Sequence, residues 1–339
     1  MTAYEELDEA YARLHRTGPE FEGWLSNHGP MVVESLVRRG RGTSVARWLD
    51  GYVLRLDEAP AAAAQPARWP DDLGDPTALG AWITSFRDAF HQAAWQDVLA
   101  HWWPRLLPGV AAGATHGAIR VGHAADALLT WGESSERIAE LALALSYWAT
   151  RWQPVPRSTA PAGTLPATDA LAAIPGVPHP EGGIGTRLAQ LDELDGWPQA
   201  QRALAPGDDA DGLLRAVVTA AVLRYSTHAH GNPVMLVHAA TAPNALRRAL
   251  AALPPELHAP TAAAGWSAAA AVFAAYAPDE ARPSGSTAAS PDDLIDRAVH
   301  HGDEHVIKLT DTVLDVYAWT ADDRSLVASE VAIAAVPTA

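Results

Sequence analysis

The sequence contains no cysteine among its 339 residues. This absence excludes disulfide frameworks, thiolate metal sites and cysteine nucleophiles. Lysine is almost as scarce, because Lys308 is the only one and every other basic residue is an arginine. The apolar runs are too short to span a bilayer, and the first residues lack the basic and apolar regions of a signal peptide. We therefore expect a cytoplasmic protein that does not enter a membrane.

Positive charge is also in short supply. The chain has 40 Asp and Glu against 24 Lys and Arg, which gives a formal net charge of -16. Nucleic acids and anionic membranes are bound mainly through clustered lysines and arginines, so neither is an expected partner. The chain also lacks the glycine-rich loops that cradle nucleotides and the serine elbow of hydrolases, which argues against a flavin or nicotinamide enzyme.

Hydrophobic residues make up 48% of the chain and charged residues 19%, which is typical of a globular protein. Apolar residues recur at helical spacing nearly everywhere, and no alternating run predicts a sheet. We predict an all-α fold, one large bundle-like domain over residues 1–339. Helices are expected to run unbroken through residues 79–101 and 294–317. Proline- and alanine-rich loops are expected at about 58–76, 153–183 and 277–291.

Histidine is abundant, with 14 residues, and nine of them lie in four patches. The patches are centred on His28, on His116 to His123, on His228 to His238, and on His300 to His305. Imidazole is a good ligand for iron, zinc, copper and nickel, so the pattern suggests a metal site. Each patch alone is equally compatible with turn, solvated or core histidines.

The last patch carries the sharpest signal. If the segment is one helix, His301, His305 and Lys308 share a face, and the apolar residues around Lys308 suggest that this face is buried. A buried lysine must be paired with an acid or be neutral, and a neutral amine is something that arginine cannot supply. The acids available for pairing are Asp303, Glu304 and Asp311.

Four segments of the sequence resemble the questin oxidase-like family. They are Ser-Asn-His-Gly-Pro-Met at 26–31, residues 115–124, residues 237–243, and Asp-Glu-His-Val-Ile-Lys at 303–308. They follow the family's order and span most of the chain, and the string His-Val-Ile-Lys is the most specific.

The resemblance implies a helical non-haem Fe(II)- and O2-dependent oxygenase. Such an enzyme cleaves a C–C bond of, or inserts oxygen into, an aromatic polyketide such as an anthraquinone or anthrone. Carried over residue by residue, it implies a metal site made of four histidines and a lysine carboxylated by CO2. These residues are His28, His116, His238, His305 and Lys308.

Three further residues are expected to act in catalysis. His123 and Arg120 stand where fungal members of the family have a tyrosine and a histidine, so the surroundings of the metal differ here. His123 shares a helix face with His116 and is the alternative ligand, although we favour His116. Arg120 is a candidate for holding a phenolate or carboxylate of the substrate, and His301 for carrying a proton.

Other functions remain open from the sequence. The histidines could serve as acid–base groups in a metal-free or NADPH-assisted Baeyer–Villiger-type monooxygenase, or hold zinc in a helical hydrolase. The chain could also be a non-catalytic small-molecule-binding accessory protein. The partner expected in each case is a small molecule, and an aromatic one would suit the 13 tryptophans, although tryptophan at helical spacing is more often part of a core.

Overall fold

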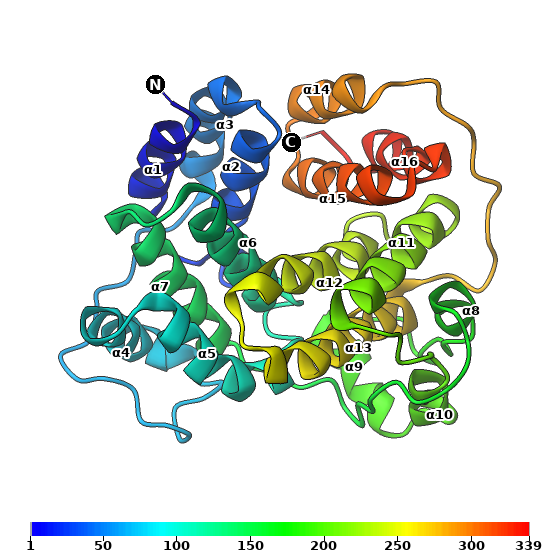
Figure 1. Cartoon of the computed structure of the whole chain (residues 1–339), viewed down its shortest axis with the longest axis horizontal. Coiled ribbons are helices and arrows are strands. Elements are labelled where there is room, and N and C mark those ends of the chain that lie inside the picture. The colour runs from blue at the N-terminus through cyan, green and yellow to red at the C-terminus, as the bar shows by residue number, and fades with distance from the viewer. Residues whose placement is uncertain (1, 339) are drawn as a thin grey trace. The chain divides into compact units, whose positions relative to one another are not determined.

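A computed structural model describes residues 2–338 and confirms the all-α prediction (Figure 1). Within that range the only sheet is a two-stranded antiparallel hairpin, β1 (Glu20–Phe21) and β2 (Leu25–Ser26). No helix in this range is long and apolar enough to cross a membrane. The chain divides into two compact units, and the prediction of a single domain stays a prediction.

The first unit comprises Met1–Pro154 and Arg248–Leu257. Helix α6 packs against α2 and α7, and α4 covers another side of α7. Nearly every residue of α6 from His116 to Leu128 is buried, so this helix lies in the core of its unit. The helices of the unit are α1 (Ala3–Leu14), α2 (Gly29–Arg38), α3 (Val45–Tyr52), α4 (Leu79–Gln92), α5 (Trp95–Leu106), α6 (His116–Trp131) and α7 (Ser135–Thr150).

The second unit comprises Val155–Arg247 and His258–Ala339. Helix α11 packs against α8, α13, α15 and α16, and α15 is buried from Glu304 to Val316. Its helices are α8 (Ala167–Ala172), α9 (Ile184–Ala189), α10 (Trp197–Arg202), α11 (Ala210–His228), α12 (His238–Ala249, whose last residues belong to the first unit), α13 (His258–Tyr276), α14 (Pro291–His301), α15 (Glu304–Thr320) and α16 (Val327–Ala335).

Two helices that were predicted to be continuous are broken, and that prediction was wrong. Residues 79–101 form α4 and α5, which are separated at Ala93 and Ala94, where the backbone is extended. Alanine is the best helix former, so the residues at this break do not predict that the helix ends there. Between α14 and α15, Gly302 adopts φ +85° as the C-cap and Asp303 caps the next helix. Glycine and aspartate favour these two positions, so this break could have been read from the sequence.

The predicted loops are mostly confirmed. No α-helix lies between Tyr52 and Leu79, or between Tyr276 and Pro291, in the described chain. The middle loop was predicted too long, because α8 forms inside it.

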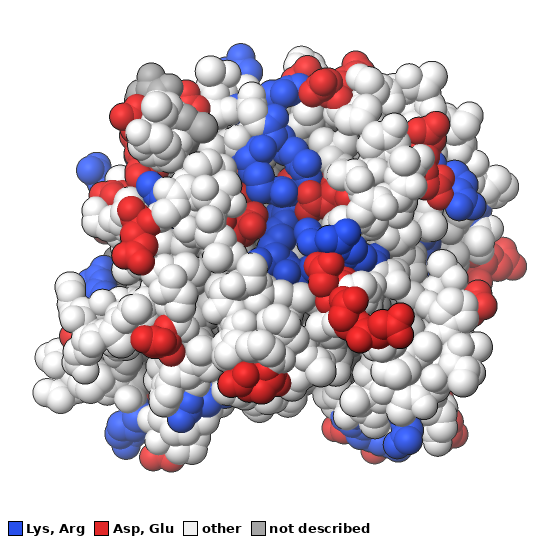
Figure 2. All heavy atoms as spheres, viewed as in Figure 1, with Lys and Arg blue, Asp and Glu red and all other residues white. Residues whose placement is uncertain are grey.

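Arginine supplies the positive charge that is visible on the surface. Lys308 is only 1% exposed, so the blue atoms visible in Figure 2 belong to arginines. Acidic side chains share this face with them, as the net charge requires.

Tryptophan builds much of the core. Trp103 and Trp148 are fully buried and meet edge to face, with ring centroids 5.5 Å apart. The indole N–H of Trp148 donates to the carbonyl of Gly109 at 2.9 Å. Gly117 lies so close that a Cβ there would come within 2.9 Å of the Trp148 backbone, which lets α6 and α7 approach each other. These tryptophans therefore act in packing.

We predict that Trp148→Ala lowers the free energy of unfolding by about 3–5 kcal/mol, because it opens a cavity and removes one of the two donors to the Gly109 carbonyl. Trp24 is 70% exposed in the same unit, so Trp24→Ala is the matched control and should change stability by less than about 0.5 kcal/mol. Urea unfolding followed by circular dichroism measures both. Equal losses in the two variants would contradict this account of the core.

Candidate metal centre

His116 is placed by an unusual turn in the first unit. Gly113, Ala114 and Thr115 all have positive φ values, of 53°, 56° and 73°, immediately before α6 begins. Two of these are not glycine, and such backbone is strained and is found mostly where function requires it. The turn brings the Gly113 carbonyl to 2.5 Å from Nδ1 of His116. A carbonyl can only accept, so Nδ1 carries the proton and Nε2 carries the lone pair that can bind a metal.

His28 is the N-cap of α2 and is held through its backbone. Its N–H donates to the hydroxyl of Tyr52 at 2.6 Å. On one side of it the Asn27 carboxamide accepts from the Gly29 N–H. A Cβ at Gly29 would come within 2.4 Å of a methyl group of Leu14, so a larger residue there would require the Leu14 side chain to move. This explains why an Asn-His-Gly sequence forms the turn.

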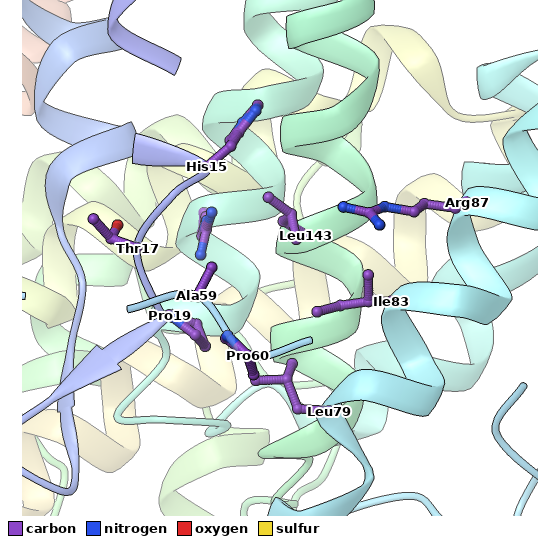
Figure 3. Close-up of a pocket in the computed structure, with 10 residues that line it drawn as sticks. His15, Thr17, Pro19, Ala59, Pro60, Leu79, Ile83, Arg87 and Leu143 are labelled. Carbon is purple, nitrogen blue, oxygen red and sulfur yellow. The ribbon is translucent and has the colours of Figure 1, made fainter. Parts of the chain in front are cut away.

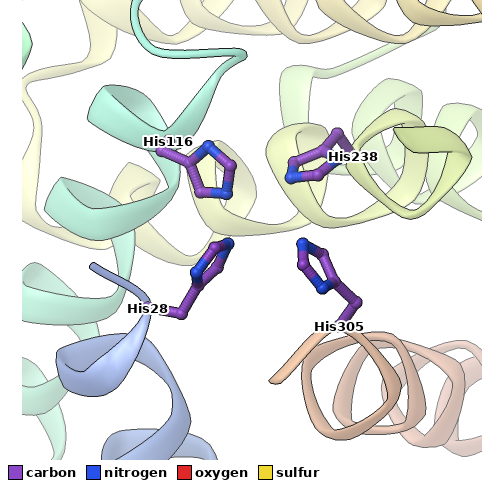
Figure 4. Close-up of side chains that lie close together, drawn as sticks. All are labelled: His28, His116, His238 and His305. Atoms are coloured by element: carbon purple, nitrogen blue, oxygen red, sulfur yellow. The ribbon is translucent and has the colours of Figure 1, made fainter. Parts of the chain in front are cut away.

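The rings of His28 and His116 meet edge to face within the first unit (Figure 4). Their centroids are 4.5 Å apart, and a nitrogen of one ring lies within 4.8 Å of a nitrogen of the other. Both side chains are buried, with 5% of each residue exposed. Two buried imidazoles with nitrogens this close are arranged as ligands of a shared ion would be.

His238 begins α12 in the second unit and is 1% exposed. Its Nδ1 lies 3.0 Å from the Met235 carbonyl, so this ring is also fixed with the proton on Nδ1 and the lone pair on Nε2. Burial lowers its pKa well below the usual value, and Lys308 and His305 lower it further. His238 is therefore neutral at pH 7, which is the form that binds metals.

His305 lies in the first turn of α15. The Asp303 carboxylate accepts from the backbone N–H groups of His305 and Val306, which starts the helix and fixes the position of His305. The rings of His305 and His238 lie 5.6 Å apart at 70°, and here too a nitrogen of each ring lies within 4.8 Å (Figure 4). The second unit thus holds a histidine pair of its own.

Lys308 follows His305 by one helical turn and is 1% exposed. Its Nζ has no hydrogen-bond partner among the described residues. Burial lowers the pKa of this amine to about 7, although Glu304 and Asp303 raise it in part. A buried amine with no acceptor is costly as an ammonium, so it is poised to be neutral or to be modified.

The four buried histidines form a set that could hold a metal ion. The set contains only imidazole, which suits iron, zinc, copper and nickel. The buried Nζ of Lys308 adds an unsatisfied group beside the pair in the second unit. The donor types therefore fit a transition metal.

The three predicted catalytic residues have other partners. His123 places Nδ1 2.6 Å from the carboxylate of Glu34, which is fully buried. Arg120 donates from Nε and Nη2 to the two oxygens of Glu140.

His301 ends α14, and its Nε2 lies 3.0 Å from the Val336 carbonyl near the end of the chain. Because the helix breaks at Gly302, the expectation that His301 shares one continuous helix face with His305 and Lys308 was wrong. The catalytic roles of His123, Arg120 and His301 stay predictions.

Sequence reasoning missed the residues that orient the histidines. Gly113 and Met235 act through their carbonyls, which no side-chain motif reveals. Glu34 and Glu140 carry a weak signal, because each is an acid inside an apolar helical stretch and therefore needs a buried partner.

No protein-family model and no curated protein matches this chain. The resemblance to the questin oxidase-like family therefore rests on the four sequence segments.

We predict that the wild type gains stability with pH relative to Lys308→Met. The pKa of Lys308 is about 7 in the folded chain against 10.5 for a free amine, so between these values the unfolded chain binds one more proton. The free energy of unfolding of the wild type should then rise by up to about 1.4 kcal/mol per pH unit more than that of the variant.

Urea unfolding at pH 7.5, 8.5 and 9.5, in buffer free of metal and CO2, measures this difference. Parallel curves for the two proteins would show that Lys308 is charged in the folded chain.

Proposed function

We propose that this chain is a non-haem iron oxygenase in which His28, His116, His238 and His305 hold Fe(II). The observation that carries the proposal is that each unit buries a histidine pair and fixes one ring of it through Nδ1, with its metal-binding nitrogen unprotonated. A neutral imidazole has one donor and one acceptor nitrogen, and the acceptor nitrogen is the one that can bind a metal. Two pairs with facing ring nitrogens are the arrangement that a metal requires.

We further propose that Lys308 completes the site as a carbamate. The neutral amine would attack the carbon of CO2 and lose one proton, so that a C–N bond forms and the product carries one negative charge on oxygen. An oxygen anion would give an otherwise all-imidazole set the hard ligand that iron favours. The chain has no second lysine, so this chemistry has one possible site on a side-chain amine.

Bound iron would supply the reaction with O2, and the protein would supply orientation and exclusion of water. His116 and His238 would keep their Nδ1 protons on backbone carbonyls throughout. Asp303 would hold His305 in place from the start of α15. The substrate class, an anthraquinone or anthrone, comes from the sequence resemblance.

Elemental analysis tests the metal. We expect near-stoichiometric iron in the wild type after anaerobic reconstitution, and loss of the iron in His305→Ala and Lys308→Ala. His228→Ala is the matched control, because His228 is also a buried histidine of the second unit but lies outside the set, so this variant should keep its iron.

Other results of the elemental analysis would favour one of the alternative functions. Zinc that iron cannot displace would favour a hydrolase, and no metal at all would leave a metal-free monooxygenase or a binding protein. Iron-loaded protein should then consume O2 together with a hydroxyanthraquinone, and no uptake with that substrate class would reject the proposed substrate.

The carbamate has its own test. With 13C-labelled bicarbonate and zinc in place of paramagnetic iron, carbon NMR should show a carbamate resonance in the wild type that is absent from Lys308→Met. A resonance that survives in the variant, or none in either protein, would reject carboxylation of Lys308 while leaving the histidine set untouched.

A further inference from the structure

A second site lies in the first unit, and none of the four histidines lines it. A cavity of about 40 Å³ opens between the end of α1, α4, α6 and α7 (Figure 3). At roughly 10–15 Å³ for each water, it has room for about three waters or a small polar group. His15, Arg87 and Arg120 line it from three different helices or helix ends.

The polar lining consists mainly of nitrogen donors. Arg120 uses Nε and Nη2 on Glu140, which leaves Nη1 without an acceptor among the described residues. Arg87 makes no ion pair or hydrogen bond with any described side chain, and no acid lines the cavity. His15 contacts Glu140 through Nε2 at 3.2 Å, and because a carboxylate only accepts, Nε2 carries the proton. Nδ1 of the neutral ring is then an acceptor, so the donors for a ligand in the cavity are the two arginines.

The charge balance around the cavity is positive. Glu140 is fully buried and its charge is matched by the two-point contact with Arg120. Burial raises the pKa of Glu140, but Arg120 and His15 together more than offset this and the net pKa lies below the usual value, so the Arg120–Glu140 pair is a neutral unit at pH 7. The guanidinium of Arg87 is then left uncompensated at the cavity.

The rest of the lining is apolar and includes Pro19, Ile83 and Leu143 (Figure 3). A ligand that fits must therefore present a small anionic head to the arginines and a hydrocarbon part to this wall. Guanidinium groups match the geometry of a carboxylate, which they bind through paired N–H donors.

We propose that this cavity binds the carboxylate of a small organic acid, with Arg87 and Nη1 of Arg120 as donors. The proposal is independent of the metal and of the oxygenase function.

The probes are acetate, propionate and butyrate, with butyramide as the neutral control, in NMR titrations of the full-length protein. We expect the dissociation constant to fall about fourfold for each added methylene, because each one covers apolar wall. Butyramide should not bind. An amide that binds as well as the acid would overturn the proposal.

Arg87→Gln should weaken butyrate binding about tenfold, because it removes a charged donor. Arg87 is exposed and unpaired, so this variant should fold normally, whereas substitution of Arg120 would strand the buried Glu140 charge. Arg47→Gln removes an exposed arginine of the same unit that does not line the cavity, and it should leave binding unchanged.

Lys308→Met tests whether butyrate binds in the cavity or at the histidine site. It alters the histidine site and should bind butyrate as the wild type does. Loss of binding in this variant, or equal weakening by Arg87→Gln and Arg47→Gln, would show that the acid binds elsewhere and would overturn the proposal.

Discussion

The burial of nitrogen bases beside one another is the constraint on which the second unit depends. His238 and Lys308 are each 1% exposed, and burial lowers the pKa of His238, with Lys308 and His305 lowering it further. Positive charges this close and this buried cannot coexist without a compensating anion. The folded chain must therefore keep these bases neutral, modify the amine, or bind a cation through their lone pairs. In each of these three cases the buried bases avoid the free-energy cost of unpaired positive charge.

Backbone carbonyls fix which ring nitrogen of these histidines carries the proton and which carries the lone pair. Two histidines on different helices, His116 and His238, each place Nδ1 against a carbonyl three residues earlier in the chain. The same local solution occurs once in each unit. It costs strain in the first unit, where Ala114 and Thr115 adopt left-handed backbone that side chains disfavour.

The sequence was sufficient for the helical class, because apolar spacing is a local signal. Residue chemistry indicated the four histidine patches, but the choice of one histidine in each patch came from the resemblance to a family. The sequence was not sufficient for the break at Ala93, where alanine favours the helix that does not form. It also could not show that Arg120 is paired with Glu140, since the two lie 20 residues apart on different helices. His301 shows a signal that was present and overlooked, because Gly302 and Asp303 mark the helix break that separates it from His305.

The single lysine has a consequence for how this chain meets its surroundings. Every positive side chain on the surface is an arginine, so acylating reagents and lysine-modifying enzymes find no ε-amine to attack on the folded molecule. The one such amine is buried on α15, and reagents larger than CO2 reach it only when that helix opens. The rate at which Lys308 is acylated therefore measures how often α15 unfolds locally in the core of the second unit.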